Sequence, residues 1–69
     1  MKLSARNVLK GAVKSVAIGP VNAELTVEVA PGLLITSIIT KKSCEDLKLK
    51  VGKKAYAIIK ASSVMIGVE

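Results

Sequence analysis

One segment constrains the fold of this chain more than any other: nine residues in which apolar and polar side chains strictly alternate. From residue 21 to residue 29, Val, Ala or Leu takes every odd position, and Asn, Glu or Thr takes every even one. A period of two predicts a β-strand with one buried face. Gly19-Pro20 before the segment and Pro31-Gly32 after it predict turns at both ends. The chain is therefore expected to build a β-sheet.

Four further segments carry strand patterns. Residues 8–18 change their apolar phase part-way and contain an interior glycine, which predicts a β-bulge or strong coiling. Residues 33–40 are apolar on both faces, as in strands that are covered on both sides. Residues 54–61 alternate again, and residues 64–68 are expected to form a last short strand. The pattern predicts an all-β fold, an OB-like small barrel of five to six strands with one short helix.

The short helix is expected between the third and fourth strands. Ser43 is a suitable N-cap, and Glu45 and Asp46 would then lie in the first turn, where the helix dipole favours acidic side chains. Leu47 and Leu49 would anchor this helix against the barrel. Cys44, beside the cap, is expected to be a small packing residue.

The sequence has more apolar residues than a chain of its size can bury. Its 69 residues make one domain, expected to span residues 1–69, and 51% of them are hydrophobic. A domain this small buries only about 60% of the surface of its unfolded chain, and its single cysteine has no disulfide partner. The surplus apolar surface, including both faces of residues 33–40, predicts a homo-oligomer in which other copies cover it.

A membrane does not account for this surplus. The longest strongly apolar stretch, residues 32–40, is far shorter than the ~20 residues of a spanning helix. Polar side chains such as Arg6, Asn7 and Lys10 interrupt the start of the chain, so no signal peptide is expected. With one free cysteine and no targeting segment, we expect a cytoplasmic protein.

Most kinds of functional site lack their usual residues in this chain. There is no histidine and there are only five acidic residues, so neither an enzyme nor a metal-cation site is expected. Cys44 has no histidine to activate it as a nucleophile. The net charge of +6 favours an anionic partner. Nucleic acid is disfavoured because Tyr56 is the only aromatic residue on which a base could stack.

Two short polar strings combine cations with small hydroxyl residues. The opening string, residues 4–7, contains Arg6, the only arginine, and the closing string, residues 60–63, contains Lys60. Arginine offers a tetrahedral oxyanion a planar fork of donors, hydroxyls add neutral donors, and successive N–H groups of a turn can form an anion nest. Composition alone leaves two interpretations open: an oxyanion site, or a frayed terminus and an ordinary turn.

Four blocks accompany these two strings: residues 9–13, 19–24, 38–40 with 43, and 47–52. With them, the chain resembles the molbindins, the small molybdate-binding proteins of the Mop family, nearly from end to end. The resemblance implies an OB-like barrel that assembles as a hexamer, a trimer of dimers. It implies that molybdate or tungstate is bound at subunit interfaces in more than one class of site. The implied role is intracellular molybdenum storage or homeostasis, without catalysis.

The resemblance also assigns residues to the sites. Side-chain ligands of one site class are Ser4, Arg6, Lys60 and Ser62. Ala5 and Ala61 are expected to contribute backbone N–H groups, and Asn7 to orient the loop. Candidates for a second site class are the polar residues Asn22, Thr40, Lys42 and Ser43.

Three functions are consistent with the sequence. The first is an oxyanion-binding storage protein. The second is a ligand-sensing regulatory module, disfavoured because the chain reads as a single module without a fused DNA-binding or ATPase segment. The third is a nucleic-acid-binding OB-like barrel, disfavoured by the missing aromatic residues.

Overall fold

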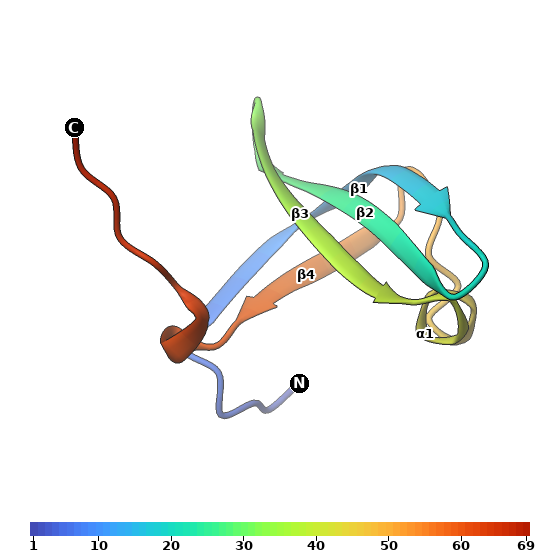
Figure 1. Ribbon diagram of the computed structural model, residues 1–69, viewed down its shortest axis with the longest axis horizontal. Coiled ribbons are helices and arrows are strands. Elements are labelled where there is room, and N and C mark those ends of the chain that lie inside the picture. Colours follow the sequence, from blue (N-terminus) through green and yellow to red (C-terminus); the bar gives the residue numbers. More distant parts are fainter.

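The sheet is built from four antiparallel strands that curl into half of a barrel (Figure 1). The structure, a computed structural model, describes residues 1–69. The strands follow the order β3-β2-β1-β4 across the sheet. Their bounds are β1 Asn7–Ile18, β2 Asn22–Ala30, β3 Leu33–Thr40 and β4 Lys54–Ile59. The all-β class is confirmed, with four strands in the chain in place of the five or six that the sequence predicts.

The long strand β1 organises the sheet because it pairs with two neighbours. Its first half pairs with β4, and its second half pairs with β2. The register with β2 shifts between Val13 and Ser15, so the predicted β-bulge is confirmed. At Gly11 the strands approach so closely that a Cβ atom would collide with the carbonyl oxygen of Glu28. The bulge and this glycine let β1 bend around the concave face of the half-barrel.

The core lies on the concave face and is small. Five residues are buried: Val13, Ala23, Leu25, Val27 and Cys44. The inward residues of the alternating segment 21–29 supply three of them, which confirms its predicted buried face. Cys44 packs in the same cluster as Val13 and Leu25, as expected of a packing residue.

The helix α1, Lys41–Asp46, begins earlier than predicted. Strand β3 runs directly into it, so Thr40 is the N-cap: its hydroxyl accepts a hydrogen bond from the Ser43 backbone N–H at 3.0 Å. The predicted Ser43 cap is therefore wrong, and Glu45 and Asp46 lie beyond the first turn. No helix of the chain has the length and apolar character needed to cross a bilayer.

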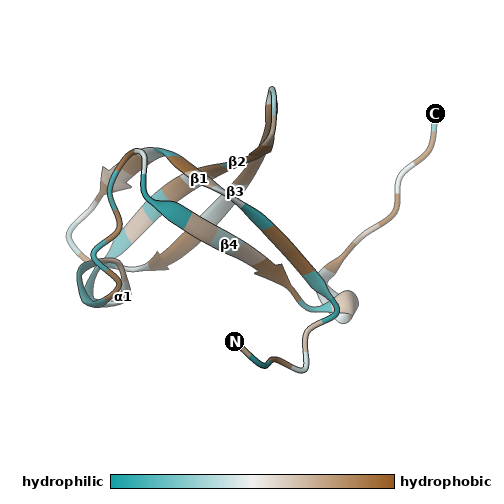
Figure 2. Ribbon diagram, turned by 180° about the vertical axis from the view of Figure 1, so that it is seen from behind, coloured by the Kyte–Doolittle hydropathy of each residue, from teal (hydrophilic) through white to brown (hydrophobic).

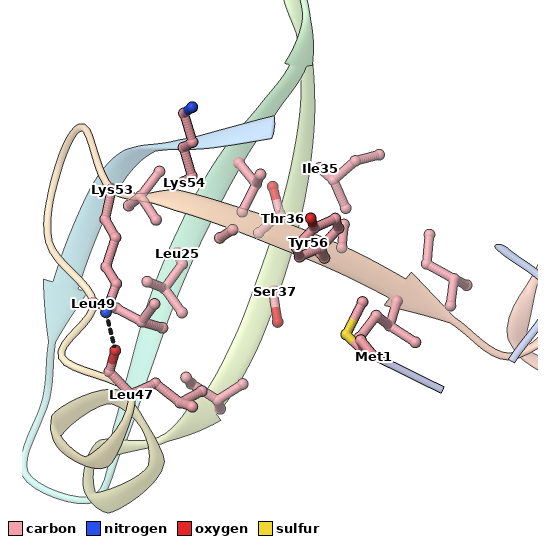
Figure 3. A pocket seen from close by; sticks show the side chains of 17 residues that line it. Met1, Leu25, Ile35, Thr36, Ser37, Leu47, Leu49, Lys53, Lys54 and Tyr56 are labelled. Carbon is pink, nitrogen blue, oxygen red and sulfur yellow. Dashed lines mark hydrogen bonds between the residues drawn. The ribbon is translucent and has the colours of Figure 1, made fainter. Parts of the chain in front are cut away.

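Parts of the half-barrel have no partner within this chain. No ladder joins the edge strands β3 and β4, and an apolar trough of about 530 Å³ runs along the concave face, lined by residues of both edges (Figure 3). Residues 64–68, predicted as a strand, instead form an extended C-terminal segment that projects away from the sheet and pairs with no strand of this chain (Figures 1 and 2). Val64 is 47% exposed, and the apolar side chains beyond it are almost fully exposed: Met65 is 92% exposed and Val68 94%.

Candidate oxyanion-binding site

The two polar strings meet at one end of the half-barrel. Six residues line a hollow of about 290 Å³ there: Ser4, Ala5, Arg6, Lys60, Ala61 and Ser62. They are the six residues to which the resemblance assigns direct contacts with the ligand. We call this feature the oxyanion hollow. It brings together, within one chain, two strings that lie more than fifty positions apart in the sequence.

The pairing of β1 with β4 explains this meeting. Asn7 is the first residue of β1, Ile59 is the last residue of β4, and the two are partners in the antiparallel ladder. The opening string ends where β1 begins, and the closing string starts directly after β4. Because the strands are antiparallel, both strings emerge from the same end of the sheet and face each other across the hollow.

The closing string is folded into a single 3₁₀ turn, η1 Ala61–Ser63. Ser63 donates its backbone N–H to the Lys60 carbonyl at 2.8 Å, and Val64 donates to the Ala61 carbonyl at 3.3 Å. The backbone N–H groups of Ala61 and Ser62 make no hydrogen bond within the chain, and neither does that of Ala5. These donors are therefore free for a ligand.

The hollow carries positive charge without compensation. Arg6 and Lys60 both line it, and no acidic residue does. The one salt bridge of the chain joins Lys42 to Asp46 on α1, far from the hollow (Figure 1). Two cations, two hydroxyls and free N–H groups all offer donors, and no carboxylate opposes an anion, which suits a small oxyanion.

Asn7 occupies a different position from the other residues of the opening string. It does not line the hollow. Its side-chain Nδ2 donates to the Ile59 carbonyl oxygen at 3.2 Å, so it joins the start of β1 to the end of β4. The expectation that Asn7 orients the loop stays a prediction, and this bond gives it a physical basis.

The four second-site candidates lie together near α1, at the end of the half-barrel away from the hollow (Figure 1). Asn22 pairs with Thr40 in the β2–β3 ladder. The Thr40 hydroxyl caps α1 and donates to the Ser43 hydroxyl at 2.8 Å, while Lys42 approaches Asp46 at 3.5 Å. Three of the four side chains are thus engaged within the chain, and a second site here stays a prediction.

The larger trough has a different chemical character. Thirteen of its seventeen lining residues are hydrophobic. In Figure 3, Leu25, Leu49 and Tyr56 lie around it, and Lys53 closes one end by donating from Nζ to the Leu47 carbonyl at 2.6 Å. This Lys53 contact could not be predicted from the sequence, because a lysine in a loop is usually solvated. Its four polar lining residues are Thr36, Ser37, Lys53 and Lys54, and the rest of the trough is a surface for apolar contact.

Comparison with known proteins places the chain in a family. A family model described as the TOBE domain matches residues 3–66. The chain belongs to the TOBE domain family. This TOBE domain is 51% identical, over the full length of both chains, to a probable molybdenum-pterin-binding protein of Haemophilus influenzae.

Two solved structures share the fold of this TOBE domain. MopII of Clostridium pasteurianum is 45% identical with a TM-score of 0.91, and the match covers 97% of this chain and 100% of MopII. The cytoplasmic molybdate-binding protein ModG, solved with molybdate bound, is 49% identical with a TM-score of 0.95. That match covers 100% of this chain and 49% of ModG. The resemblance to the Mop family and the OB-like fold class are confirmed.

Proposed function

We propose that this TOBE domain protein binds molybdate or tungstate in the oxyanion hollow and serves molybdenum storage or homeostasis in the cytoplasm. The observation that carries the proposal is the meeting of the two polar strings in one hollow without an acidic residue. Relatives described as molybdenum-pterin-binding or as molybdate-binding support the choice of ligand. ModG, described as cytoplasmic, supports the location.

Each residue of the hollow has a role in this proposal. Arg6 offers paired N–H donors to two oxygens of the anion, and Lys60 contributes a compact positive charge. Ser4 and Ser62 donate neutral hydroxyl hydrogen bonds. The free N–H groups of Ala5 and Ala61 complete the shell. None of these groups is a general acid, a general base or a nucleophile with an activating partner, so the proposed role is binding without catalysis.

A shell rich in donors also selects among oxyanions. Molybdate and tungstate are tetrahedral dianions that carry no proton at neutral pH, so every oxygen can accept. Monoprotonated phosphate carries an O–H that only the Ser4 or Ser62 hydroxyl could accept, and against the other donors it would stay unpaired, which costs binding free energy. Sulfate matches in charge and shape but is smaller, so its rejection depends on the spacing of the two strings.

We further propose that the protein works as a homo-oligomer, a hexamer built as a trimer of dimers. A single chain leaves the trough open, the edges of β3 and β4 unpaired and the apolar residues 64–68 exposed. Exposed apolar strands and edges of this kind favour pairing with further chains. The hollow itself is open to solvent on one chain, with Arg6 and Lys60 exposed, and a second copy over it would exclude water from the anion.

Native mass spectrometry with and without molybdate tests these proposals together. We expect six chains per particle and anion adducts on the wild type. Arg6→Ala should lose adducts, whereas Lys10→Ala, which removes an exposed cation outside the hollow, should keep them. A wild type without adducts, or equal adducts on both variants, would contradict the assignment of the hollow. A monomer would contradict the assembly.

A further inference from the structure

One hydrogen bond differs from every other side-chain hydrogen bond of the chain. The bond from Asn7 Nδ2 to the Ile59 carbonyl joins residues 52 positions apart. The remaining side-chain hydrogen bonds join residues at most 11 positions apart. Asn7 is half-buried, whereas the groups in the other bonds are exposed. Asn7 is therefore the one side chain whose hydrogen bond joins the N-terminal part of the chain to the C-terminal part.

The position of this bond matters because of its neighbours. Asn7 and Ile59 form the terminal pair of the β1–β4 ladder, and the next residue outward on each chain segment is a cation, Arg6 or Lys60. Beyond the pair, no backbone hydrogen bond joins the opening string to the closing string. Like charges repel each other. In the absence of a ligand, the terminal pair must hold the two cations near each other against this repulsion.

We infer that Asn7 is a positioning residue that sets the spacing between Arg6 and Lys60 and thereby the preference of the hollow for molybdate over sulfate. The inference rests on the proposed oxyanion site. The Asn7 amide adds a second attachment to a ladder pair at a strand end, where pairing otherwise frays. A fixed spacing favours the larger anion that fits it, while a site free to open and close adapts to either anion and discriminates less.

Three variants separate this role from a general loss of stability. Asn7→Ala removes the hydrogen bond from Asn7 to the Ile59 carbonyl, which we call the clamp. Asn7→Asp keeps the shape but replaces the N–H donor with a negatively charged acceptor that faces the Ile59 carbonyl. Ser15→Ala is the matched control: it lies on the same strand and loses a hydroxyl hydrogen bond, to Thr26 at 2.6 Å, but lies outside the hollow.

Calorimetry should give the dissociation constants of molybdate and sulfate for each variant. We expect Asn7→Ala to weaken molybdate binding by about three- to tenfold, the factor that corresponds to one net hydrogen bond. Asn7→Asp should weaken it further, because its negative charge repels the anion. Sulfate binding should change less in Asn7→Ala, so the ratio of the sulfate dissociation constant to the molybdate dissociation constant should fall. Ser15→Ala should keep the wild-type ratio. Equal weakening of both anions in Asn7→Ala, or wild-type behaviour of Asn7→Asp, would overturn the inference.

A second measurement on the ligand-free protein separates this inference from the proposed function. Amide hydrogen exchange at Ser63 and Val64, whose N–H groups are hydrogen-bonded in η1, should be faster in Asn7→Ala than in Ser15→Ala. The difference should shrink at about 1 M salt, where the screening length falls to roughly 3 Å and the two cations no longer repel strongly. Unchanged exchange in Asn7→Ala would overturn the clamp. A wild type that binds neither anion would overturn the proposed function, and exchange alone would then decide the clamp.

Discussion

Gly11 is the position at which the smallest possible substitution should have the largest effect on stability. In Gly11→Ala, the new methyl group would overlap the carbonyl oxygen of Glu28 on β2 and approach its carbonyl carbon at 2.9 Å and Val27 Cγ1 at 3.1 Å. The main obstacle is backbone within a hydrogen-bonded ladder, so no rotamer change relieves it. Strands β1 and β2, which both supply residues to the small core, must therefore move apart.

The expected magnitude follows from two opposing effects. Overpacking a close-packed site costs about 1–3 kcal/mol, and a backbone obstacle places this case at the upper end. Replacing glycine with alanine restricts the unfolded chain, which stabilises the folded state by about 0.4–1 kcal/mol. The net loss is about 2 kcal/mol in the free energy of unfolding. For a domain of this size, the melting temperature should fall by roughly 8–16 °C.

Far-UV circular dichroism is the appropriate assay, because the chain has no tryptophan and one tyrosine. All samples need the same protein concentration, since assembly makes the melting temperature depend on it. Lys10→Ala is the control: it changes the exposed neighbour on the same strand to the same residue and should stay within about 0.5 kcal/mol. If Gly11→Ala had the same melting temperature as Lys10→Ala, the close approach of β1 to β2 would be refuted.

Three other predictions concern the ligand and the assembly. Arg6→Ala should weaken molybdate binding by roughly 1.5–3 kcal/mol in calorimetry, the scale of a charge-assisted hydrogen bond, and Arg6→Lys should recover only part of it; unchanged affinity and stoichiometry would refute the site. Molybdate should raise the melting temperature of the wild type, and Lys60→Ala should lose most of that increase while melting normally without ligand. If Lys60→Ala showed the full increase, Lys60 would be an ordinary surface lysine. Light scattering at micromolar concentration should give an oligomer mass, and a monomer would refute assembly.

Local patterns predicted most of the strands well, because the side chains that a strand buries are determined by the alternation of neighbouring residues. The alternation over residues 21–29 reports directly on which side chains face the core, and β2 buries them as expected. The phase change in β1 reports on the bulge between Val13 and Ser15 in the same way. The residue types of the two polar strings similarly indicated donors for an anion before any geometry was known.

Features that depend on distant parts of the chain could not be predicted from such patterns. Thr40 and Ser43 are both good caps, and the choice between them depends on where β3 stops, which its pairing with β2 decides. The apolar residues 64–68 carry a strand pattern, but a strand needs a partner, and this chain supplies none. The spacing of Arg6 and Lys60 depends on the register of β1 against β4, which no local signal encodes.

The residues of the oxyanion hollow come from both ends of the chain, which has a consequence for biosynthesis. Arg6 and Lys60 are separated by 54 positions, and a ribosome that adds about 5–20 residues per second needs roughly 3–11 s to cover them. During that time the nascent chain presents Arg6 without its counterpart. The β1–β4 ladder closes a long loop, a slow step in folding. In the proposed site, ligand binding therefore follows synthesis, because a chain interrupted before β4 carries only half of the residues that line the hollow.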